Sequence, residues 1–593
     1  MFETHDRSTN MYSFVGFNIN ISVTALLFLL SNTSHYQVRA DAGLITSEDY
    51  DTFNIGGYGD WPKQHYHSSD LTSPLFLVNK WNESAISNHS HIFMSPTLDG
   101  EEKSPMIFSS KDLSLVYADH TWHGGSDTKL QFYNGKPYLT FWSGIDFQGH
   151  GSGGGVMLNS SYDKVYNISV NSLAGGADGH EFQLTEDGGA MMNNYHTTIA
   201  DCRPVGGPNG GKVLTGSFQE VDIETGWVRH TWNALDHFGL NESFTTYVDE
   251  EWGWDWFHMN SLQKTTERHY LISSRHLRMI AYINGTDGNK IWQVGGYNND
   301  FTDLSGGNAT NFAFQHHARF VNDDLTEITF FDNHNMYMNS PTPNCTTDCS
   351  RGMKIKLNYH NMTVKLVHQF YHPKSVQAWA EGGIHALDNG NFLVGYGVVP
   401  SFVEFTETGE VAMEIQTRPW YVASGRGTDL YRVYKFDWVA QPSWKPVMVE
   451  VGQILYISWN GATQVESWAL YGGSSPTTMH HLLTMPKTGF ETGVRPSNSS
   501  AFYQAIALDK DGNELDSTEI LEMYRLSSPT ILRIPEEYLT AMRFFPFIWA
   551  AVMLISMALS HSTLWIKLRK RMRGRDNDVG EGMEKESKSK LLP

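Results

Sequence analysis

Four side chains in the middle of the chain have the chemistry to hold and transfer an oxyanion. His180, His258, Arg275 and His316 supply three imidazoles and one guanidinium. A guanidinium donates paired, planar hydrogen bonds to an oxyanion, and an imidazole can act as acid, base or nucleophile. The set contains no carboxylate, which favours a negatively charged ligand. Each of these histidines alone, out of 26 in the chain, would more simply be structural.

A repeated strand pattern places these residues at equivalent positions. His180, His258, His316 and Glu381 each open a pair of short apolar segments joined by a turn rich in Asp, Asn and Gly, and their spacings are 78, 58 and 65 residues. Several pairs are followed by a second hairpin, as over residues 281–292. Loose repetition of four-stranded units is typical of propeller blades with loop insertions. Inner strands of a propeller end at one central channel, so the opening residues should meet there.

The remaining strand pattern predicts an all-β fold in two domains. Residues 130–158 look like an earlier copy of the unit, and residues 427–436 could close the ring, which counts to five or six blades. An array of β-sandwiches is the alternative interpretation. After Pro442 the strands shorten and Trp468 is a candidate buried tryptophan, which indicates a small sandwich of immunoglobulin or fibronectin type. We therefore predict a propeller over 43–440 and a sandwich over 441–530.

Composition excludes several functional classes. The 593 residues carry a net charge of −21, so a nucleic-acid partner is excluded because phosphate binding needs a clustered basic surface. Only 18% of residues are charged, whereas 13% are aromatic and 53 are Gly, which suits short strands and tight turns. Three Cys are too few for a disulfide scaffold or a cage of four thiolates.

The two ends of the chain predict a single-pass membrane protein. Residues 1–42 contain an apolar run and a small-residue cleavage pattern, which indicates a signal peptide. Residues 544–566 are long enough for a helix across the bilayer, and the tail 567–593 begins with a cluster of Lys and Arg that should stay cytosolic. An uncleaved anchor and a buried helix are the alternatives. The predicted topology is type I, with the catalytic domain lumenal or extracellular.

Glycosylation sequons and cysteines fit that compartment. Cys345 and Cys349 are close enough to close a small disulfide loop, which leaves Cys202 over. Ten sequons lie between the predicted cleavage site and the membrane segment, and this density fits a secreted glycoprotein domain. They are Asn82, Asn88, Asn159, Asn167, Asn241, Asn284, Asn308, Asn344, Asn361 and Asn498.

Two further patterns were weighed as ligand sites. Residues 206–212 nearly spell a phosphate-binding loop, but Val213 stands where Ser or Thr is needed and a strand pattern follows. The run Asp332-Asn333-His334 could ligate a metal but is more simply a hairpin turn. The sequence therefore predicts neither a metal site nor a cofactor.

Several fragments resemble the aryl-sulfate sulfotransferase family, most closely its eukaryotic, fungal-type, membrane-anchored branch. They include Asp255-Trp-Phe-His258-Met-Asn-Ser261, Ile272-Ser-Ser-Arg275-His276 and Phe314-Gln-His316-His-Ala-Arg319. The resemblance covers roughly residues 43–530. It implies a six-bladed propeller that moves a sulfuryl group from an aryl sulfate donor to a phenolic acceptor by a ping-pong route. The donor would not be the nucleotide sulfate PAPS.

The resemblance also implies a role for each residue. His316 would be the nucleophile that becomes sulfohistidine, His258 and Arg275 would hold sulfate oxygens, and His180 would act as base or donor. His317 follows His316 directly, and adjacent strand residues face opposite sides, so only one of the two can enter the channel. Two other functions remain open: an inactive propeller that binds an anionic or aromatic ligand, and a hydrolase of sulfate or phosphate esters.

Overall fold

The structure, a computed structural model, describes residues 36–523 except 99–102, 123, 148, 338, 341, 422–429 and 498–499. The predicted membrane segment 544–566, the tail, most of the predicted signal peptide and Asn498 lie outside the described residues. Within the described part of the chain, no helix is long and apolar enough to cross a membrane. The described residues belong to one compact unit.

Strands make up almost all of the regular structure in the described ranges, which confirms the all-β prediction. The helical elements there are α2 (Tyr50–Asn54) and four 3-10 turns of three residues each. The first three sheets along the chain are β31–β6–β7–β8 (Tyr434–Phe436, His91–Met94, Met106–Ser109, Leu115–Ala118), β9 to β12 (Ser126–Tyr133, Lys136–Phe147, His150–Leu158, Lys164–Ile168) and β13 to β16 (Phe182–Leu184, Gly189–Asp201, Asn209–Asp222, Val228–Asn233).

Three more antiparallel sheets follow in the same manner. They are β18 to β21 (Met259–Lys264, Tyr270–Ser274, Met279–Ile283, Lys290–Gly295), β23 to β26 (His316–Phe320, Glu327–Asp332, Arg351–Asn358, Thr363–Tyr371) and β27 to β30 (Gly383–Ala386, Phe392–Gly395, Ser401–Phe405, Val411–Gln416). Short strands extend some sheets: β17 (Trp254–Asp255) on β15, β22 (Thr302–Asp303) on β26, and β5 (Leu77–Trp81) with β2 (Ile45–Thr46) on β30. β3 (Lys63–His65) pairs with β4 (Thr72–Pro74) alone.

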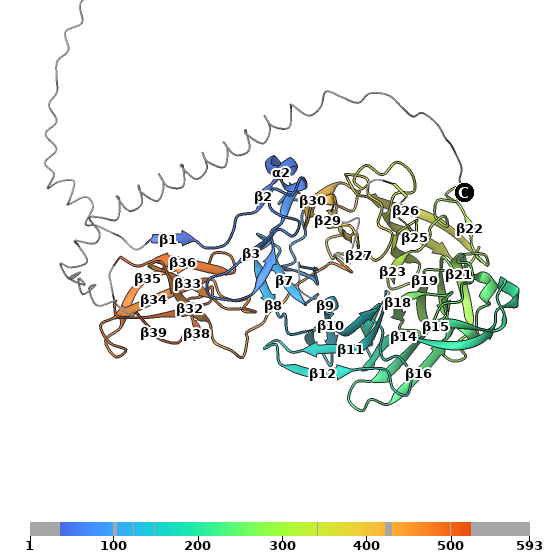
Figure 1. The fold of residues 1–593 in the computed structure, drawn as a ribbon, viewed down its shortest axis with the longest axis horizontal. Helices are drawn as coiled ribbons and strands as arrows, with labels where there is room; N and C mark the ends of the chain where they lie inside the picture. The colour runs from blue at the N-terminus through green and yellow to red at the C-terminus, as the bar shows by residue number, and fades with distance from the viewer. Residues whose placement is uncertain are drawn as a thin grey trace, which may run out of the picture. The chain divides into compact units, whose positions relative to one another are not determined.

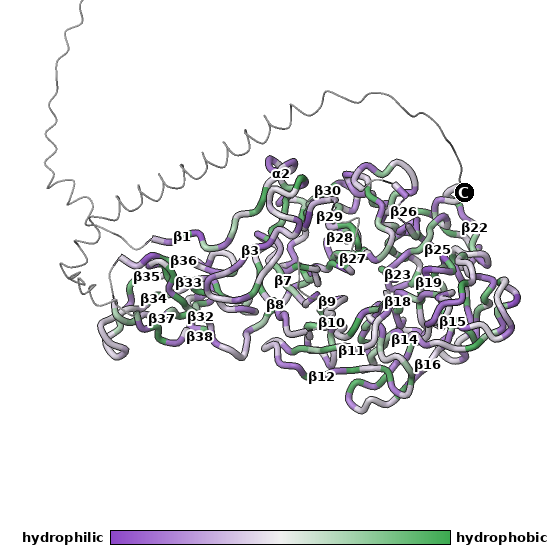
Figure 2. Tube along the Cα trace, viewed as in Figure 1, coloured by the Kyte–Doolittle hydropathy of each residue, from purple (hydrophilic) through white to green (hydrophobic). Residues whose placement is uncertain are grey.

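These six sheets follow one another around a common centre (Figure 1). The first or second strand of each sheet contacts its neighbour, as in β9 with β13, β18 with β23 and β23 with β27. Strands such as β6 and β20 are buried along their whole length, because each sheet is covered by a sheet on both faces. Hydrophobic residues accordingly run along whole strands, as at β28 (Figure 2).

Two further sheets contain the C-terminal strands. The first is β1–β36–β33–β32 (Tyr36–Arg39, Glu491–Arg495, Ile454–Ser458, Val447–Val451), and the second is β35–β34–β37–β38 (His480–Pro486, Ser467–Gly473, Phe502–Leu508, Glu514–Ser517) with β39 (Leu521–Glu522) beside β37. Their facing side chains form one core in which Trp468 is fully buried.

These two sheets form a sandwich, and one of its strands comes from the N-terminal segment. This strand was not predicted from the sequence. β1 lies within the predicted signal peptide 1–42, and it pairs with β36. The Asp41 carboxylate also accepts hydrogen bonds from the backbone N–H groups of Phe490 and Glu491, at 2.7 and 2.9 Å. Cleavage at the small residues Ala40 to Ala42 would therefore remove a paired strand.

Two cysteines that are four residues apart pair with each other, and the third is unpaired. Cys345 and Cys349 form a disulfide with their Cα atoms 5.8 Å apart, and Cys202 is a buried free thiol.

The ring of sheets is closed by a buried ion pair. β31, the last strand of the ring in the sequence, pairs with β6 of the first sheet. Lys435 on β31 places its Nζ 2.6 Å from Oε2 of Glu404 on β29 of the last sheet, and both side chains are fully buried. Glu404 also accepts hydrogen bonds from the Ser87 backbone N–H and the Asn391 amide. The pair therefore joins the first and last sheets.

We expect Lys435→Met to lower the free energy of unfolding by about 3–5 kcal/mol, because it leaves Glu404 buried without its cation. Urea denaturation followed by tryptophan fluorescence measures this change. Lys445→Met is the matched control: its ion pair with Glu519 is largely exposed, so little change is expected. Equal midpoints for the two variants would contradict the role assigned to the buried pair.

Candidate active site

The sequence-predicted residues lie where the innermost strands begin. His180 precedes β13, His258 directly precedes β18, and His316 is the first residue of β23. Glu381 takes the equivalent place before β27. His258 and Glu381 have φ angles of +51° and +61°, a left-handed conformation that is uncommon outside glycine and often marks a functional position.

His180 and His258 face each other across two sheets. Their Nε2 atoms are 3.2 Å apart. On the opposite side of each ring, Nδ1 of His180 lies 2.5 Å from Oδ1 of Asp178, and Nδ1 of His258 lies 2.5 Å from Oδ2 of Asp255. Each imidazole is therefore oriented by its own aspartate.

The two aspartates are ionised at neutral pH. Burial alone would raise the pKa of Asp178, but the contacts with His180 outweigh burial and lower the pKa to about 2. The pKa of Asp255 is likewise lowered well below its usual range, because contacts with His258, His276 and His150 outweigh the effect of burial. Burial lowers the pKa of His258 well below 6.5. An ionised Asp255 beside a neutral His258 follows, with the ring proton of His258 on Nδ1.

His316 is held in one neutral tautomer. Its Nδ1 is 2.7 Å from Oδ1 of Asn333, and the Asn333 amide nitrogen donates to the carbonyls of Ala378 and Glu381, both at 2.9 Å. Those two bonds fix which atom of the amide faces His316, so Nδ1 donates and Nε2 keeps its lone pair. Burial, followed by the charge of Arg275, lowers the pKa of His316 well below 6.5. The ring is thus neutral at neutral pH, with an unprotonated Nε2.

Arg275 brings a positive charge that no neighbouring carboxylate neutralises directly. Its side chain donates to the carbonyl of Trp379 at 2.9 Å and lies 2.8 Å from Nε2 of His276. Among the described residues no carboxylate lies within ion-pair distance of it. Burial lowers the pKa of Arg275 to about 10, which still leaves it protonated at neutral pH. Such a buried guanidinium is suited to an anionic ligand.

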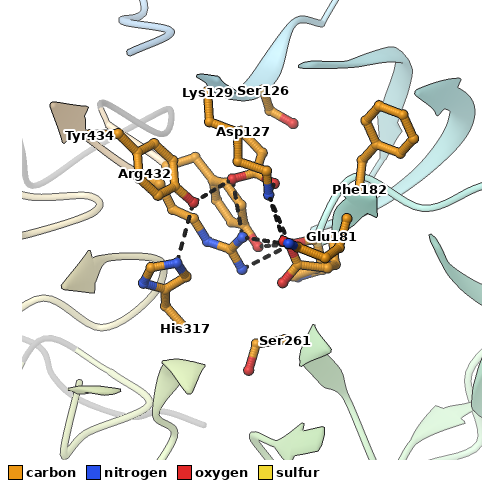
Figure 3. Close-up of polar contacts among 12 residues, drawn as sticks. Ser126, Asp127, Lys129, Glu181, Phe182, Ser261, His317, Arg432 and Tyr434 are labelled. Carbon is orange, nitrogen blue, oxygen red and sulfur yellow. Dashed lines mark hydrogen bonds and ion pairs between the residues drawn. The ribbon is translucent and has the colours of Figure 1, made fainter. Parts of the chain in front are cut away.

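His317 points away from the other histidines. Its Nε2 lies 3.2 Å from the hydroxyl of Tyr434, and its Nδ1 accepts a hydrogen bond from the backbone N–H of Ile384 (Figure 3). The charges that act on it most strongly belong to Arg319 and Arg432, whereas those that act on His316 belong to Arg275 and the two facing histidines. Of the two adjacent histidines, His316 is therefore the one that lies near Arg275, His180 and His258.

A cavity of about 770 Å³ lies on the side of His317. It is lined by His317, Lys129, Arg319 and Tyr434 among others, and by none of the four predicted residues. Arg275 instead lies near two exposed aromatic residues. It donates a hydrogen bond to the carbonyl of Trp379, and Tyr337 is among the groups that raise the pKa of Arg275.

Several polar neighbours of these histidines were not predicted from the sequence. Asp178 and Asp255 stand two and three residues before the histidines they orient, and this recurring acidic residue was a usable signal. Glu381 was identified as an opening residue but given no role. It is buried, its Oε2 has no hydrogen-bond partner among the described residues, and burial raises its pKa.

His150 lies in a Gly-rich segment and was not predicted from the sequence as a site residue. The possible ligand atoms of His150, Asp178 and His180 lie within 4.8 Å of one another, and so do those of His150, Asp255 and His258. This corner of the site therefore has the donors for a metal ion.

We expect His316 to remain neutral, with its proton on Nδ1, at about pH 5.5, where an ordinary histidine of pKa about 6.5 is mostly charged. Selective ¹⁵N-histidine NMR measures this, with His316→Asn to assign the signal and the urea-unfolded chain as the reference. A protonated ring at that pH, or a proton on Nε2, would contradict the assignment.

One comparison with known proteins identifies a family for the central part of the chain. Residues 129–418 match the family model described as arylsulfotransferase (ASST). No curated protein matches the chain.

Three solved structures give the scale of the structural similarity. A Bacteroides caccae protein of unknown function is 13% identical, over 58% of this chain and 98% of its own, with a TM-score of 0.31. The periplasmic gluconolactonase PpgL of Pseudomonas aeruginosa is 10% identical, over 73% and 96%, with a TM-score of 0.31. The Dos1 propeller is 9% identical, over 74% and 81%, with a TM-score of 0.24.

The family match covers the whole central part of the ring. It includes His180, His258, Arg275 and His316, together with the aspartates that orient two of the histidines. Residues 129–418 therefore belong to the arylsulfotransferase family.

Proposed function

We propose that this protein is a six-bladed propeller enzyme that transfers a sulfuryl group from an aryl sulfate ester to a phenolic acceptor, without PAPS and through a sulfohistidine at His316. The observation that carries the proposal is a buried, neutral His316, held by Asn333 with its Nε2 lone pair available, next to the charge of Arg275. A neutral imidazole is a competent nucleophile, and a fixed cation stabilises the charge that develops during transfer.

In the first half-reaction, Nε2 of His316 attacks the sulfur of the donor. An N–S bond forms while the bond from sulfur to the aryl oxygen breaks, and the phenolate leaves with the electron pair. Arg275 stabilises the negative charge on the sulfuryl and phenolate oxygens. The proton on Nδ1 of His316 stays in place, because the oxygen of Asn333 continues to accept its hydrogen bond as the ring becomes positive.

The second half-reaction returns the histidine to its starting state. The acceptor phenol oxygen attacks sulfur, the N–S bond breaks, and Nε2 regains its lone pair. The phenol proton needs an acceptor, and His180 with His258 supplies imidazole nitrogens beside His316. Glu381, buried with a raised pKa, is a second group that can hold a proton in the same region.

The location of the protein is also a proposal. We propose that it enters the secretory pathway and is anchored by residues 544–566, with the enzyme on the lumenal or extracellular side. Of the nine sequon asparagines that the structure describes, seven are exposed and two, Asn159 and Asn284, are partly exposed. Accessible sequons support glycosylation, which takes place in that compartment.

We expect His316→Ala to reduce transfer by about 10³-fold or more, because the covalent route is lost, whereas His317→Ala keeps most of the turnover. The assay follows release of a chromogenic phenol from its sulfate ester, with and without an acceptor phenol. Mass spectrometry should find an acid-labile sulfuryl group on His316 after donor alone.

The same assay separates the alternatives. Release that needs no acceptor would indicate a hydrolase, and no release would indicate a binding protein. Full transfer by His316→Ala would refute the assigned nucleophile.

We expect Arg275→Met to lower kcat by about 10²–10³-fold, the loss typical of one oxyanion donor. The matched control is Arg278→Met. Arg275 and Arg278 both stack on the ring of Phe314, at 5.2 and 4.6 Å, but Arg278 is not among the charges that act on His316. Equal losses in the two variants would mean that packing on Phe314, and not charge in the site, explains the effect.

A further inference from the structure

The cavity on the side of His317 has an excess of positive charge in its buried wall. The ion-pair network at this wall contains three cations and two carboxylates, namely Lys129, Arg319 and Arg432 with Asp127 and Glu181. Within the network, one positive charge therefore has no counterion. Lys129 and Arg319 both line the cavity, and charges interact more strongly where water is largely excluded. An anion bound in the cavity would balance this charge.

The acidic residues of the cavity wall do not supply that counterion. Glu186, Asp187 and Asp323 line the cavity, but all three are exposed to solvent. In the described part of the chain, none of them forms an ion pair with Lys129 or Arg319. Water and salt screen exposed charges far more than buried ones. The buried part of the wall therefore stays positive.

Two amide side chains of the wall present hydrogen-bond donors. Oε1 of Gln263 accepts the backbone N–H of Phe320 at 2.9 Å. Oε1 of Gln183 faces Nζ of Lys129 at 3.5 Å. A backbone N–H and an ammonium group only donate, so these contacts fix which end of each amide faces them. The two NH₂ groups are left as donors, and neither has a hydrogen-bond partner among the described residues.

Arg319 and His385 add two more donors to the wall. The terminal nitrogens of Arg319 donate to the carbonyl of Ala318 and to Glu181, whereas its Nε has no partner among the described residues. Nδ1 of His385 accepts the backbone N–H of Lys435 at 3.2 Å, so the proton of the neutral ring is on Nε2. Burial lowers the pKa of His385 to about 3, which keeps the ring neutral at neutral pH. A ligand rich in acceptors, such as an oxyanion, would satisfy these donors.

The cations and donors come from the first strands of five successive sheets. They are Lys129 on β9, Gln183 on β13, Gln263 on β18, Arg319 on β23 and His385 on β27. Apolar side chains make up other parts of the wall, namely Leu130, Phe320, Ile384 and Phe436. The volume of about 770 Å³ lies in the range of pockets for small organic molecules, and a bare inorganic anion would leave most of it unfilled.

We propose that this cavity is a binding site for a small organic anion, whose charged group lies against Arg319 and the amide of Gln263 and whose apolar body packs on the hydrophobic side chains of the wall. The hydrogen bond from Phe320, the residue after Arg319, holds Gln263 beside it. Carboxylates, sulfates and phosphates share the required chemistry, a negative charge with several acceptor oxygens. None of the four sequence-predicted site residues lines the cavity, so the site is separate from the candidate active site.

The first test is isothermal titration calorimetry of the full-length protein. The probes are benzoate, benzenesulfonate and phenylphosphonate, which carry no transferable group, and benzamide is the neutral control. We expect saturable binding of at least one anion and no binding of benzamide at the same concentrations, and the tightest probe identifies the preferred charged group. Equal binding of benzamide, or no saturable binding of any anion, would overturn the proposal.

The substitution Gln263→Glu assigns the site. It keeps the oxygen that accepts from Phe320 but replaces the NH₂ donor by a carboxylate oxygen, which supplies the missing counterion. We expect binding of the tightest of the three probes to weaken about 10- to 100-fold. Gln183→Glu, beside Lys129, should act in the same way. Gln453→Glu, in an exposed turn of the sandwich, changes the net charge equally and should bind as the parent does.

The same variants distinguish this cavity from an anion site next to Arg275. If the parent binds two anions per chain, Gln263→Glu and Gln183→Glu should each lose one and keep the other. Circular dichroism identifies a variant that fails to fold, and the second variant then decides. Unchanged binding in the folded variants would place every bound anion outside this cavity and overturn the proposal.

This inference does not rest on sulfuryl transfer, and the two fail separately. Probe binding that is lost in Gln263→Glu, in a protein without transfer activity, would refute the proposed function and keep the anion site. Acceptor-dependent transfer by a protein that binds none of the probes in this cavity would do the reverse.

Discussion

The rest of the structure depends on one buried carboxylate at the centre of the ring. Glu181 is fully buried, and its oxygens lie 3.0 Å from Lys129 and 3.2 Å from Arg432 (Figure 3). They also lie 2.5 Å from Arg319. Burial alone would raise the pKa of Glu181, but these three cations hold it well below the usual range. A buried charge without partners costs several kcal/mol. The ion pairs therefore hold together strands β9 and β23 and the segments that lead into β13 and β31.

The ion-pair network around Glu181 also positions the backbone next to His180 and His258. Arg432 donates hydrogen bonds to the backbone carbonyls of His180 and Asn260, at 3.0 and 2.9 Å. These bonds hold the backbone of His180 next to β18, the strand that begins directly after His258. His317 faces the network, and His316 faces the opposite way, toward Arg275. Structural charges and reactive groups therefore lie on two sides of the same strand openings.

The side that faces Arg275 is built from imidazoles held by fixed partners. Asn333 orients His316, and the aspartates orient His180 and His258, so the orientation of each ring is set before any ligand arrives. Preorganised groups of this kind lose little free energy to reorientation during a reaction.

The all-β fold, the repeated openings and the family followed from the sequence alone, because strand periodicity, turn residues and motifs are local patterns. The different partners of His316 and His317, the contacts of Asp178, Asp255 and Asn333, and the position of His150 beside His180 and His258 were decided only by the tertiary structure. His180 and His258 are 78 residues apart, and which atoms face each other depends on how the sheets close around Glu181. No local pattern encodes that closure, since it is set by the summed packing and buried charges of the whole ring.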